Sequence, residues 1–277
     1  MCGIFGVSGS TPAVPLIAAG LKKLEYRGYD SSGIAVNGEK GIWLCKSAGS
    51  LSHLEKKLNQ SAPPLSSVGI GHTRWATHGK ATDLNAHPFL SADGMFAVAH
   101  NGIIENYTGL KAFLSEKGFS FVSDTDSEVV PMLLEYFYDG DVLKAIRRAV
   151  SELEGAFSLA IITSHAPDCV FAARKDSSLA IGFGKGCSFV SSDIPAISGF
   201  AEQCCIPDEN SVAVLRKGEI KLFDRQGNRT APSFKPTGEC GGDAEKGDFP
   251  FFMLKEIFSQ PCLLYTSDAA DELDGVD

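Results

Sequence analysis

A cysteine stands at position 2, at the start of the apolar segment 2–8 (CGIFGVS), whose composition is typical of a strand. Initiator methionine is normally removed before a small residue, and its removal would leave a thiol and a free α-amine on Cys2. An α-amine has a pKa of roughly 7.7–8.0, so about a tenth of it is uncharged at pH 7. It can therefore act as general base for the thiol without a histidine. The alternative is that Cys2 is only an apolar strand residue.

Basic and hydroxyl side chains gather in the segment 71–79 (GHTRWATHG), where a predicted strand over 68–73 runs into a loop. Arg74 can hold a carboxylate through two parallel hydrogen bonds, and Thr77 and His78 add donors on the same loop. The alternative is a surface loop whose arginine pairs within the protein.

Two further segments place polar groups at the ends of predicted elements. Asn101 and Gly102 follow a strand over 95–100. The Asn101 amide and the Gly102 N–H can point at one oxygen and form an oxyanion hole, or the pair can be a type I′ turn. Asp126 opens a predicted helix over 126–138, where it can hold a ligand ammonium or serve only as an N-cap.

The spacing of the metal-binding residue types argues against a metal site. Eight cysteines and six histidines form no C-x-x-C or H-x-x-x-H pattern, and we expect the cysteines to be reduced thiols. The glycines at 182–186 do not fit a dinucleotide-binding fingerprint, and no P-loop pattern occurs. We therefore expect neither a metal nor an organic cofactor.

The composition is that of a globular protein: 277 residues, 44% hydrophobic, 21% charged and a net charge of -9. The acidic balance argues against nucleic acid and anionic membranes as partners. No apolar run approaches the ~20 residues that span a bilayer, and the N-terminus does not resemble a signal peptide. We expect a cytoplasmic protein.

The elements that must position these residues alternate between helices and short strands. We expect a helix opened by Thr11 as N-cap and Pro12 at N1, and a hairpin turn at Asn37-Gly38 between strands 33–36 and 41–46. Further helices are expected from Ser50 to the prolines at 63–64, over 106–117 with Gly118 as terminator, and over 141–152.

Residues 156–223 contain six short strands joined by turns that are too short for the crossover helices of a parallel sheet. This pattern predicts an α+β sandwich of two mostly antiparallel sheets with helices covering their outer faces.

Several of these segments occur in an order that resembles the class II glutamine amidotransferases. The resemblance covers about residues 1–261 and rests on six segments: 1–6 (MCGIFG), 24–31 (LEYRGYDS), 71–79, 85–88 (NAHP), 100–106 (HNGIIEN) and 123–126 (SDTD). It implies the N-terminal-nucleophile hydrolase fold, a four-layer αββα sandwich.

The resemblance also implies roles at a glutamine site. Cys2 would attack the γ-carbonyl, and Asn101 with Gly102 would stabilise the oxyanion. The carboxylate of glutamine would be bound by Arg74, Thr77 and His78, and its ammonium by Asp126. Trp75 would gate the passage of ammonia, and the segment 27–30 would lie near the nucleophile.

Within that class, the segments 24–30, 72–79 and 252–261 (FMLKEIFSQP) are similar to the members that aminate fructose 6-phosphate. Those members continue with a sugar-phosphate isomerase portion, whereas residues 262–277 match nothing in the family. We expect a glutaminase domain over 2–224, a connector over 225–261 towards a missing isomerase domain, and a disordered tail over 262–277. Fructose 6-phosphate would bind only through the missing domain, and the full-length form would be a homo-oligomer.

Two alternatives remain open. The chain can be the glutaminase domain of another class II amidotransferase, such as the phosphoribosylpyrophosphate-dependent enzyme or asparagine synthetase. It can also be an inactive fragment or an interaction module.

Overall fold

The computed structural model describes residues 2–39, 41–77, 79–239, 249, 253–255 and 257–258. The chain divides into two units, Met1–Gly242 and Asp243–Asp277, and the strands and helices that carry the site belong to the first. In the second unit, residues 253–255 and 257–258 are helical.

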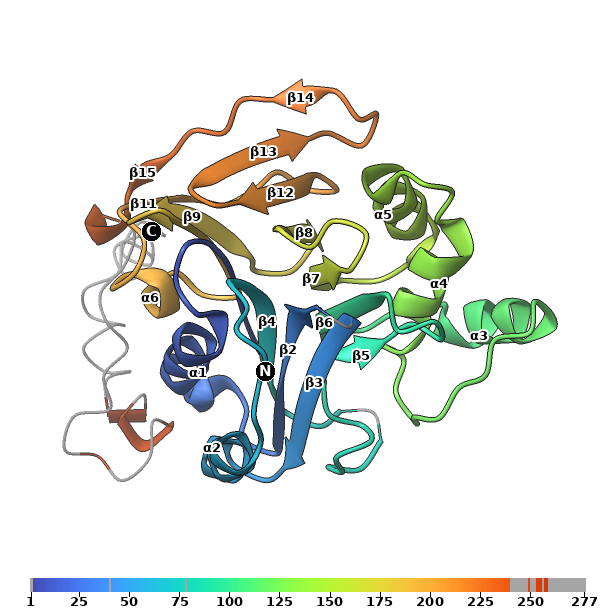
Figure 1. Cartoon of the computed structure of the whole chain (residues 1–277), viewed down its shortest axis with the longest axis horizontal. Helices are drawn as coiled ribbons and strands as arrows, with labels where there is room; N and C mark the ends of the chain where they lie inside the picture. The colour runs from blue at the N-terminus through green and yellow to red at the C-terminus, as the bar shows by residue number, and fades with distance from the viewer. Residues whose placement is uncertain are drawn as a thin grey trace, which may run out of the picture. The chain divides into compact units, whose positions relative to one another are not determined.

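Two sheets form the centre of the first unit (Figure 1), and their strands pair antiparallel throughout the described ladders. The first sheet has the order β15 (Lys235–Pro236), β11 (Gln203–Cys205), β9 (Ala180–Gly184), β10 (Cys187–Ser191), β1 (Gly3–Ser8), β4 (Val68–Arg74), β2 (Ser31–Gly38) and β3 (Gly41–Ala48). The second has the order β14 (Arg229–Thr230), β13 (Glu219–Phe223), β12 (Val212–Arg216), β8 (Cys169–Lys175), β7 (Phe157–Thr163), β6 (Phe96–Gly102) and β5 (Phe89–Leu90).

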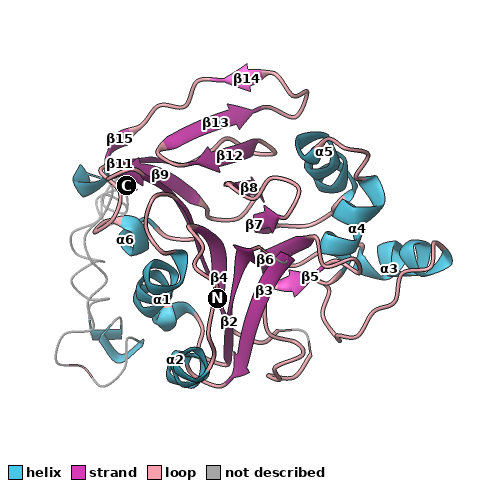
Figure 2. Ribbon diagram, in the orientation of Figure 1, coloured by secondary structure: helices cyan, strands magenta, loops and turns pink. Residues whose placement is uncertain are grey.

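Helices cover the outer face of each sheet (Figure 2). The first sheet packs against α1 (Ala13–Lys23), α2 (Leu51–Gln60) and α6 (Ile194–Ile197). The second packs against α3 (Tyr107–Glu116), α4 (Val129–Phe137) and α5 (Val142–Glu152).

Three apolar clusters hold these layers together. Side chains alternate between the two faces of a strand. On β1, Phe5 accordingly packs into the cluster beneath α1, whereas Ile4 packs into the cluster between the sheets. Strands such as β1 and β7 are buried along their whole length, so they carry apolar residues on both faces. The arrangement confirms the predicted four-layer α+β sandwich.

Some local predictions were wrong. The α1 helix begins at Ala13 with Pro12 as N-cap, and the Thr11 hydroxyl lies 3.4 Å from Cys187 Sγ instead of capping the helix. The hairpin turn does not fall at Asn37-Gly38, because Gly38 pairs with Gly41 inside the ladder. Asn37 instead donates to the carbonyls of Thr163 (3.3 Å) and Pro167 (3.1 Å), so its amide links the two sheets.

Short elements were not predicted, namely β5, β11, β14, β15 and α6. Two of them, β14 and β15, lie in the segment 225–261, which we predict to be a connector. They add one edge strand to each sheet. Gly118 does end α3, with φ +94° and its N–H donating to Ser115 O (3.0 Å).

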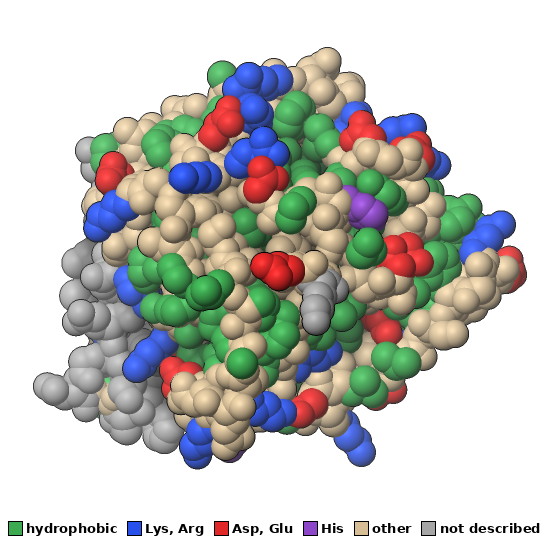
Figure 3. Space-filling model, viewed as in Figure 1, with side chains coloured by type: hydrophobic (Ala, Val, Ile, Leu, Met, Phe, Trp, Pro, Cys, Tyr) green, Lys and Arg blue, Asp and Glu red, His purple; other side chains and the backbone are tan. Residues whose placement is uncertain are grey.

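The surface carries both signs of charge. Figure 3 shows Lys and Arg side chains interspersed with Asp and Glu over the face in view. Among the residues that the structure describes, no helix has the length and apolar character needed to cross a bilayer.

Candidate active site

The Cys2 thiol lies against the end of β4. The register of β1 and β4 pairs Gly3 with Thr73, so Cys2 lies beside the point where Arg74 and Trp75 follow. The Trp75 N–H donates to Cys2 Sγ (3.3 Å), and the thiol lies 3.5 Å from Trp75 O. Burial raises the pKa of the Cys2 thiol, although the Trp75 N–H and the charges of Arg74 and Arg27 oppose the rise. The thiol is therefore protonated at neutral pH and needs a base.

Two side chains hold the carbonyl of the nucleophile residue. Cys2 O accepts hydrogen bonds from Arg27 Nε (2.9 Å) and Asn101 Nδ2 (3.1 Å). Arg27 also forms an ion pair with Asp193 (3.3 Å), whose carboxylate accepts the Tyr26 hydroxyl as well. The Cys2–Gly3 peptide is thus held by two side chains.

The loop at 27–30 packs on the segment that follows β4. Asp30 N–H donates to Arg74 O (3.0 Å), and Asp30 Oδ2 accepts from Ala76 N–H (2.9 Å). The Tyr29 ring meets Trp75 edge-on at 5.3 Å, and Trp75 is 37% exposed. Trp75 lies at the rim of the site, and its gating role stays a prediction.

Asn101 and Gly102 belong to β6 and pair with Ser158 and Phe157 of β7, so the alternative of a type I′ turn is wrong. Gly102 has φ +118°, and a Cβ there would lie 2.0 Å from Ala156 O. Ile103 N–H donates to Ala156 O (3.0 Å). Hydrogen-bonded pairs alternate along an antiparallel ladder, so the Gly102 N–H points away from β7.

The orientation of the Asn101 amide is set by His72. His72 Nε2 lies 2.9 Å from both Asn101 Oδ1 and His100 O. Both atoms are acceptors, so Nε2 carries the proton and donates it. Asn101 therefore directs Nδ2 towards Cys2, where one of its two hydrogens bonds Cys2 O and the other can reach a substrate oxygen.

His72, His87 and His100 form a buried stack, here called the histidine column. The rings of His72 and His87 lie 4.2 Å apart, and those of His87 and His100 lie 6.2 Å apart. Burial lowers the pKa of His72 to about 3 and the pKa of His87 well below its usual value. Burial also lowers the pKa of His100. The column is neutral at pH 7.

The histidine column was missed from the sequence. Each histidine lies in or beside a strand, and no spacing along the chain shows that the three rings meet.

Arg74 and Asp126 supply buried charges of opposite sign. Arg74, 4% exposed, donates to the carbonyls of Gly79 (3.4 Å) and Lys80 (3.3 Å). Burial lowers the pKa of Arg74, and negative charge on Cys2, when it is ionised, and on Asp126 opposes this.

Asp126 does not cap a helix, because α4 begins at Val129 with Glu128 as N-cap. Its Oδ2 accepts from the Ile104 N–H (2.8 Å) and its Oδ1 from the Ser127 hydroxyl (3.3 Å). Ser127 also bonds His100 Nδ1 (2.7 Å), so Asp126 connects to the histidine column.

The other two predicted carboxylate-binding residues are Thr77 and His78, and their role stays a prediction. Thr77 is exposed on the loop after Trp75, and His78 lies outside the described residues. In the described part of the chain, no group of three or more His, Cys, Asp or Glu side chains could hold a metal ion. The arrangement therefore combines a thiol, two directed N–H donors and one fixed charge of each sign.

A family model described as a glutamine amidotransferase domain matches residues 72–199. The chain is 44% identical over 261 residues to a glutamine–fructose-6-phosphate aminotransferase (isomerizing) of Clostridium tetani, covering 94% of this chain and 43% of that protein. It is 42% identical over 261 residues to the protein of the same name from Aquifex aeolicus, covering 94% and 44%. The chain thus spans less than half the length of these relatives.

Solved structures share the fold. The glutamine phosphoribosylpyrophosphate amidotransferase of B. subtilis matches with a TM-score of 0.71 and 25% identity, over 82% of this chain and 50% of that one. A glutamine aminotransferase class-II domain protein from Silicibacter pomeroyi matches with a TM-score of 0.54 and 14% identity, over 81% and 99%.

Proposed function

The chain belongs to the glutamine amidotransferases with the N-terminal-nucleophile fold, and we propose that it hydrolyses glutamine to glutamate and ammonia with Cys2 as nucleophile. The observation that carries this proposal is the bond from Asn101 Nδ2 to Cys2 O (3.1 Å). It holds a donor amide, oriented by His72, beside the nucleophile residue.

The chemistry begins after removal of Met1, which frees the α-amine of Cys2. The amine accepts the thiol proton, and Sγ forms a bond to the γ-carbonyl carbon of glutamine. The carbonyl oxygen becomes an oxyanion, which Asn101 Nδ2 and the Gly102 N–H stabilise by about 3–4 kcal/mol per donor. The carbon–nitrogen bond then breaks, and ammonia leaves with the proton held by the amine. Water hydrolyses the thioester, which releases glutamate and restores the thiol.

The buried charges give specificity for an α-amino acid. The Arg74 guanidinium binds the α-carboxylate together with Thr77 and His78, and Asp126 binds the α-ammonium. Hydrogen bonds from the Ile104 N–H and the Ser127 hydroxyl hold the Asp126 carboxylate in place before substrate arrives. Such preorganisation reduces the ordering that substrate binding must impose.

The identity of about 43% to the fructose-6-phosphate aminotransferases supports fructose 6-phosphate as the acceptor of the ammonia. The chain is the ammonia-supplying half of a glucosamine-6-phosphate synthase, which forms glucosamine 6-phosphate and glutamate in amino sugar biosynthesis. Fructose 6-phosphate binds through an isomerase domain in a cytoplasmic homo-oligomer, and Trp75 gates the ammonia. The identity of 25% to the phosphoribosylpyrophosphate enzyme is lower and favours this assignment.

The test is glutamate formation from glutamine by the purified chain and by Cys2→Ser, with Cys45→Ser as a matched control. Cys45 lies on β3 and is half-buried. We expect Cys2→Ser to lose nearly all activity while keeping its folding transition, because a hydroxyl is a far weaker nucleophile with so weak a base. Cys45→Ser should keep the parent rate. Full activity in Cys2→Ser would overturn the proposed nucleophile.

A further inference from the structure

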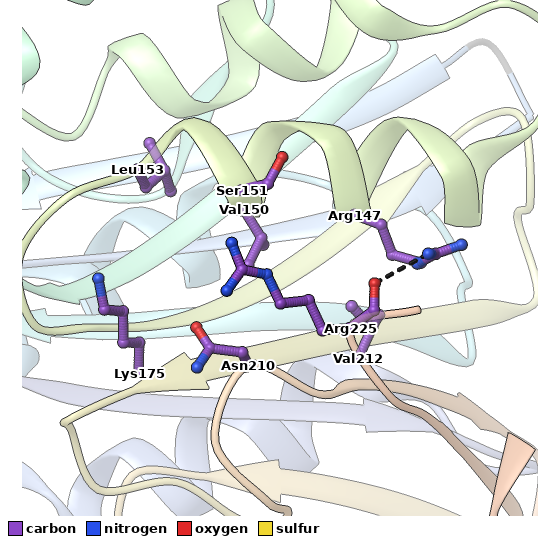
Figure 4. Close-up of a pocket in the computed structure, with 8 residues that line it drawn as sticks. All are labelled: Arg147, Val150, Ser151, Leu153, Lys175, Asn210, Val212 and Arg225. Atoms are coloured by element: carbon purple, nitrogen blue, oxygen red, sulfur yellow. Dashed lines mark hydrogen bonds between the residues drawn. The ribbon is translucent and has the colours of Figure 1, made fainter. Parts of the chain in front are cut away.

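A pocket of about 110 Å³ lies between the C-terminal half of α5, the end of β8 and the turn after β13 (Figure 4). Three of the residues that line it are basic, namely Arg147, Lys175 and Arg225, and Asn210 adds an amide. None of its described lining residues is acidic, although the chain carries a net charge of -9. We propose that this pocket binds the phosphate group of a small anion, either inorganic phosphate or a phosphate monoester.

Arg147 fixes the turn that presents Arg225. Arg147 Nη2 donates to Arg225 O (2.8 Å), the bond drawn in Figure 4. The turn closes on this guanidinium, since a Cβ at Gly227 would lie 2.2 Å from Arg147 Nη1. Figure 4 shows the Arg225 side chain extending from the turn towards the side of the pocket where Lys175 and Asn210 lie. The turn that carries Arg225 is therefore held in place by Arg147.

Two of the neighbouring carboxylates, those of Asp224 and Glu209, are engaged elsewhere. Asp224 accepts from the backbone N–H (2.8 Å) and the Nδ2 (3.0 Å) of Asn228. Glu209 pairs with Arg174 and accepts from Asp176 N–H (2.8 Å). Within the described residues, neither Lys175 nor Arg225 forms an ion pair. No described carboxylate therefore lies within ion-pair distance of either cation.

The donor set suits a tetrahedral dianion. Arg225 offers a planar fork of N–H groups, Lys175 a compact charge, and Asn210 a neutral amide. Phosphate oxygens accept such charge-assisted hydrogen bonds from several directions at once, whereas a carboxylate presents only two oxygens in one plane. The small volume admits a phosphate group and leaves the rest of a monoester outside.

The pocket is distinct from the glutamine site. Lys175 pairs with Phe157, which pairs with Gly102, so two strand spacings, about 10 Å, separate it from the predicted oxyanion hole. Leu153 in the pocket wall is followed by Glu154 and Ala156. The Glu154 carbonyl accepts a hydrogen bond from the Glu105 N–H, and the Ala156 carbonyl accepts one from the Ile103 N–H.

The experiment is a calorimetric titration of the intact chain with inorganic phosphate and, separately, with glycerol 3-phosphate, at constant ionic strength and without glutamine. We expect saturable binding with a Kd in the millimolar range that weakens as chloride rises. Lys175→Gln and Arg225→Gln should each weaken it by about fivefold or more, since each removes a charge-assisted bond. Lys217→Gln, which changes an exposed lysine in the β12–β13 turn, should bind like the parent.

The two probes separate the two sources of the phosphate group. Tighter binding of glycerol 3-phosphate would assign the site to a phosphorylated metabolite, and tighter binding of phosphate would assign it to the free ion. Absence of saturable binding for both probes would overturn the proposal. So would equal affinities in the parent, Lys175→Gln and Arg225→Gln. Because no glutamine is present, neither result depends on the proposed glutaminase activity.

Discussion

Replacing His87 with phenylalanine should make the fold less sensitive to mild acid. His72 and His87 are buried, and burial keeps the pKa of both below the ordinary histidine value of 6.5. The unfolded chain takes up protons on these residues as the pH falls through 6.5, whereas the folded chain does not. Their contribution to stability is therefore complete above pH 6.5 and is lost progressively below it.

The size of the loss follows from linkage. Between pH 7.5 and pH 5.5, a histidine that titrates only in the unfolded chain lowers the free energy of unfolding by about 1.4 kcal/mol. His72 and His87 together account for about 3 kcal/mol, a large share of the 5–15 kcal/mol typical of a domain. His87→Phe should reduce the difference between the two pH values by about 1.4 kcal/mol.

The assay is urea unfolding followed by tryptophan fluorescence at pH 7.5 and pH 5.5. His87→Phe should be less stable than the parent at pH 7.5, because His100 N–H loses its acceptor, His87 Nδ1 (3.2 Å), at a cost of about 1–3 kcal/mol. At pH 5.5 this deficit should be smaller by about 1.4 kcal/mol. The diagnostic quantity is the difference between the pH values. His53→Gln, at an exposed position of α2, is the control and should leave that difference unchanged. An unchanged difference in His87→Phe would refute the neutral column.

Four further outcomes are expected at the proposed site. Asn101→Ala should lower kcat by roughly 10²–10³ with a modest change in KM, because the oxyanion forms only in the transition state; steady-state rates decide this. Gly102→Ala should melt at a lower temperature and lose kcat, since φ +118° and the nearby carbonyl leave no room for Cβ, whereas Gly109→Ala meets nothing within 4 Å and should fold normally. Arg74→Lys should mainly raise KM, because a point charge cannot replace the planar fork, and an unchanged KM would place Arg74 outside the carboxylate site. Intact-mass spectrometry should show active protein without Met1, and full activity in protein that retains it would contradict the α-amine mechanism.

The layered fold was predictable because both sheets are buried on two faces. Five of the seven residues of β7 (FSLAIIT) are apolar, and every residue of this strand is buried. The short turns after residue 157 exclude crossover helices, so antiparallel pairing follows from length alone. Helix ends were also predictable where a local device acts, as at Asp141, whose carboxylate accepts from Lys144 N–H (3.0 Å).

Predictions failed where tertiary partners decide the local structure. Asn37-Gly38 has the composition of a hairpin turn, but two carbonyls of the other sheet bind the Asn37 amide and keep it within β2. Asp126 has the composition of an N-cap, but the Ile104 N–H binds its carboxylate and the helix starts later. In both cases a side chain that could serve its own backbone is used by a distant segment instead.

The histidine column shows why the site could be predicted only in part. Cys2, Arg74 and Asn101 belong to short segments whose residue types suggest chemistry by themselves. His72 lies on β4 of one sheet and Asn101 on β6 of the other, so their hydrogen bond exists only once the sheets face each other. Residue spacing within one segment carries no information about such a contact.

The same geometry determines the charge state of the column and the direction of the Asn101 amide. His87 Nδ1 accepts the His100 N–H and must be unprotonated, while His72 Nε2 faces two acceptors and must be protonated. His72 Nδ1 is buried with no hydrogen-bond partner among the described residues, and a proton there would be an unpaired buried charge. His72 is therefore held as the neutral tautomer that donates to Asn101 Oδ1. Because a flipped amide would set a second N–H donor against His72 Nε2, only the orientation with Nδ2 towards Cys2 is stable.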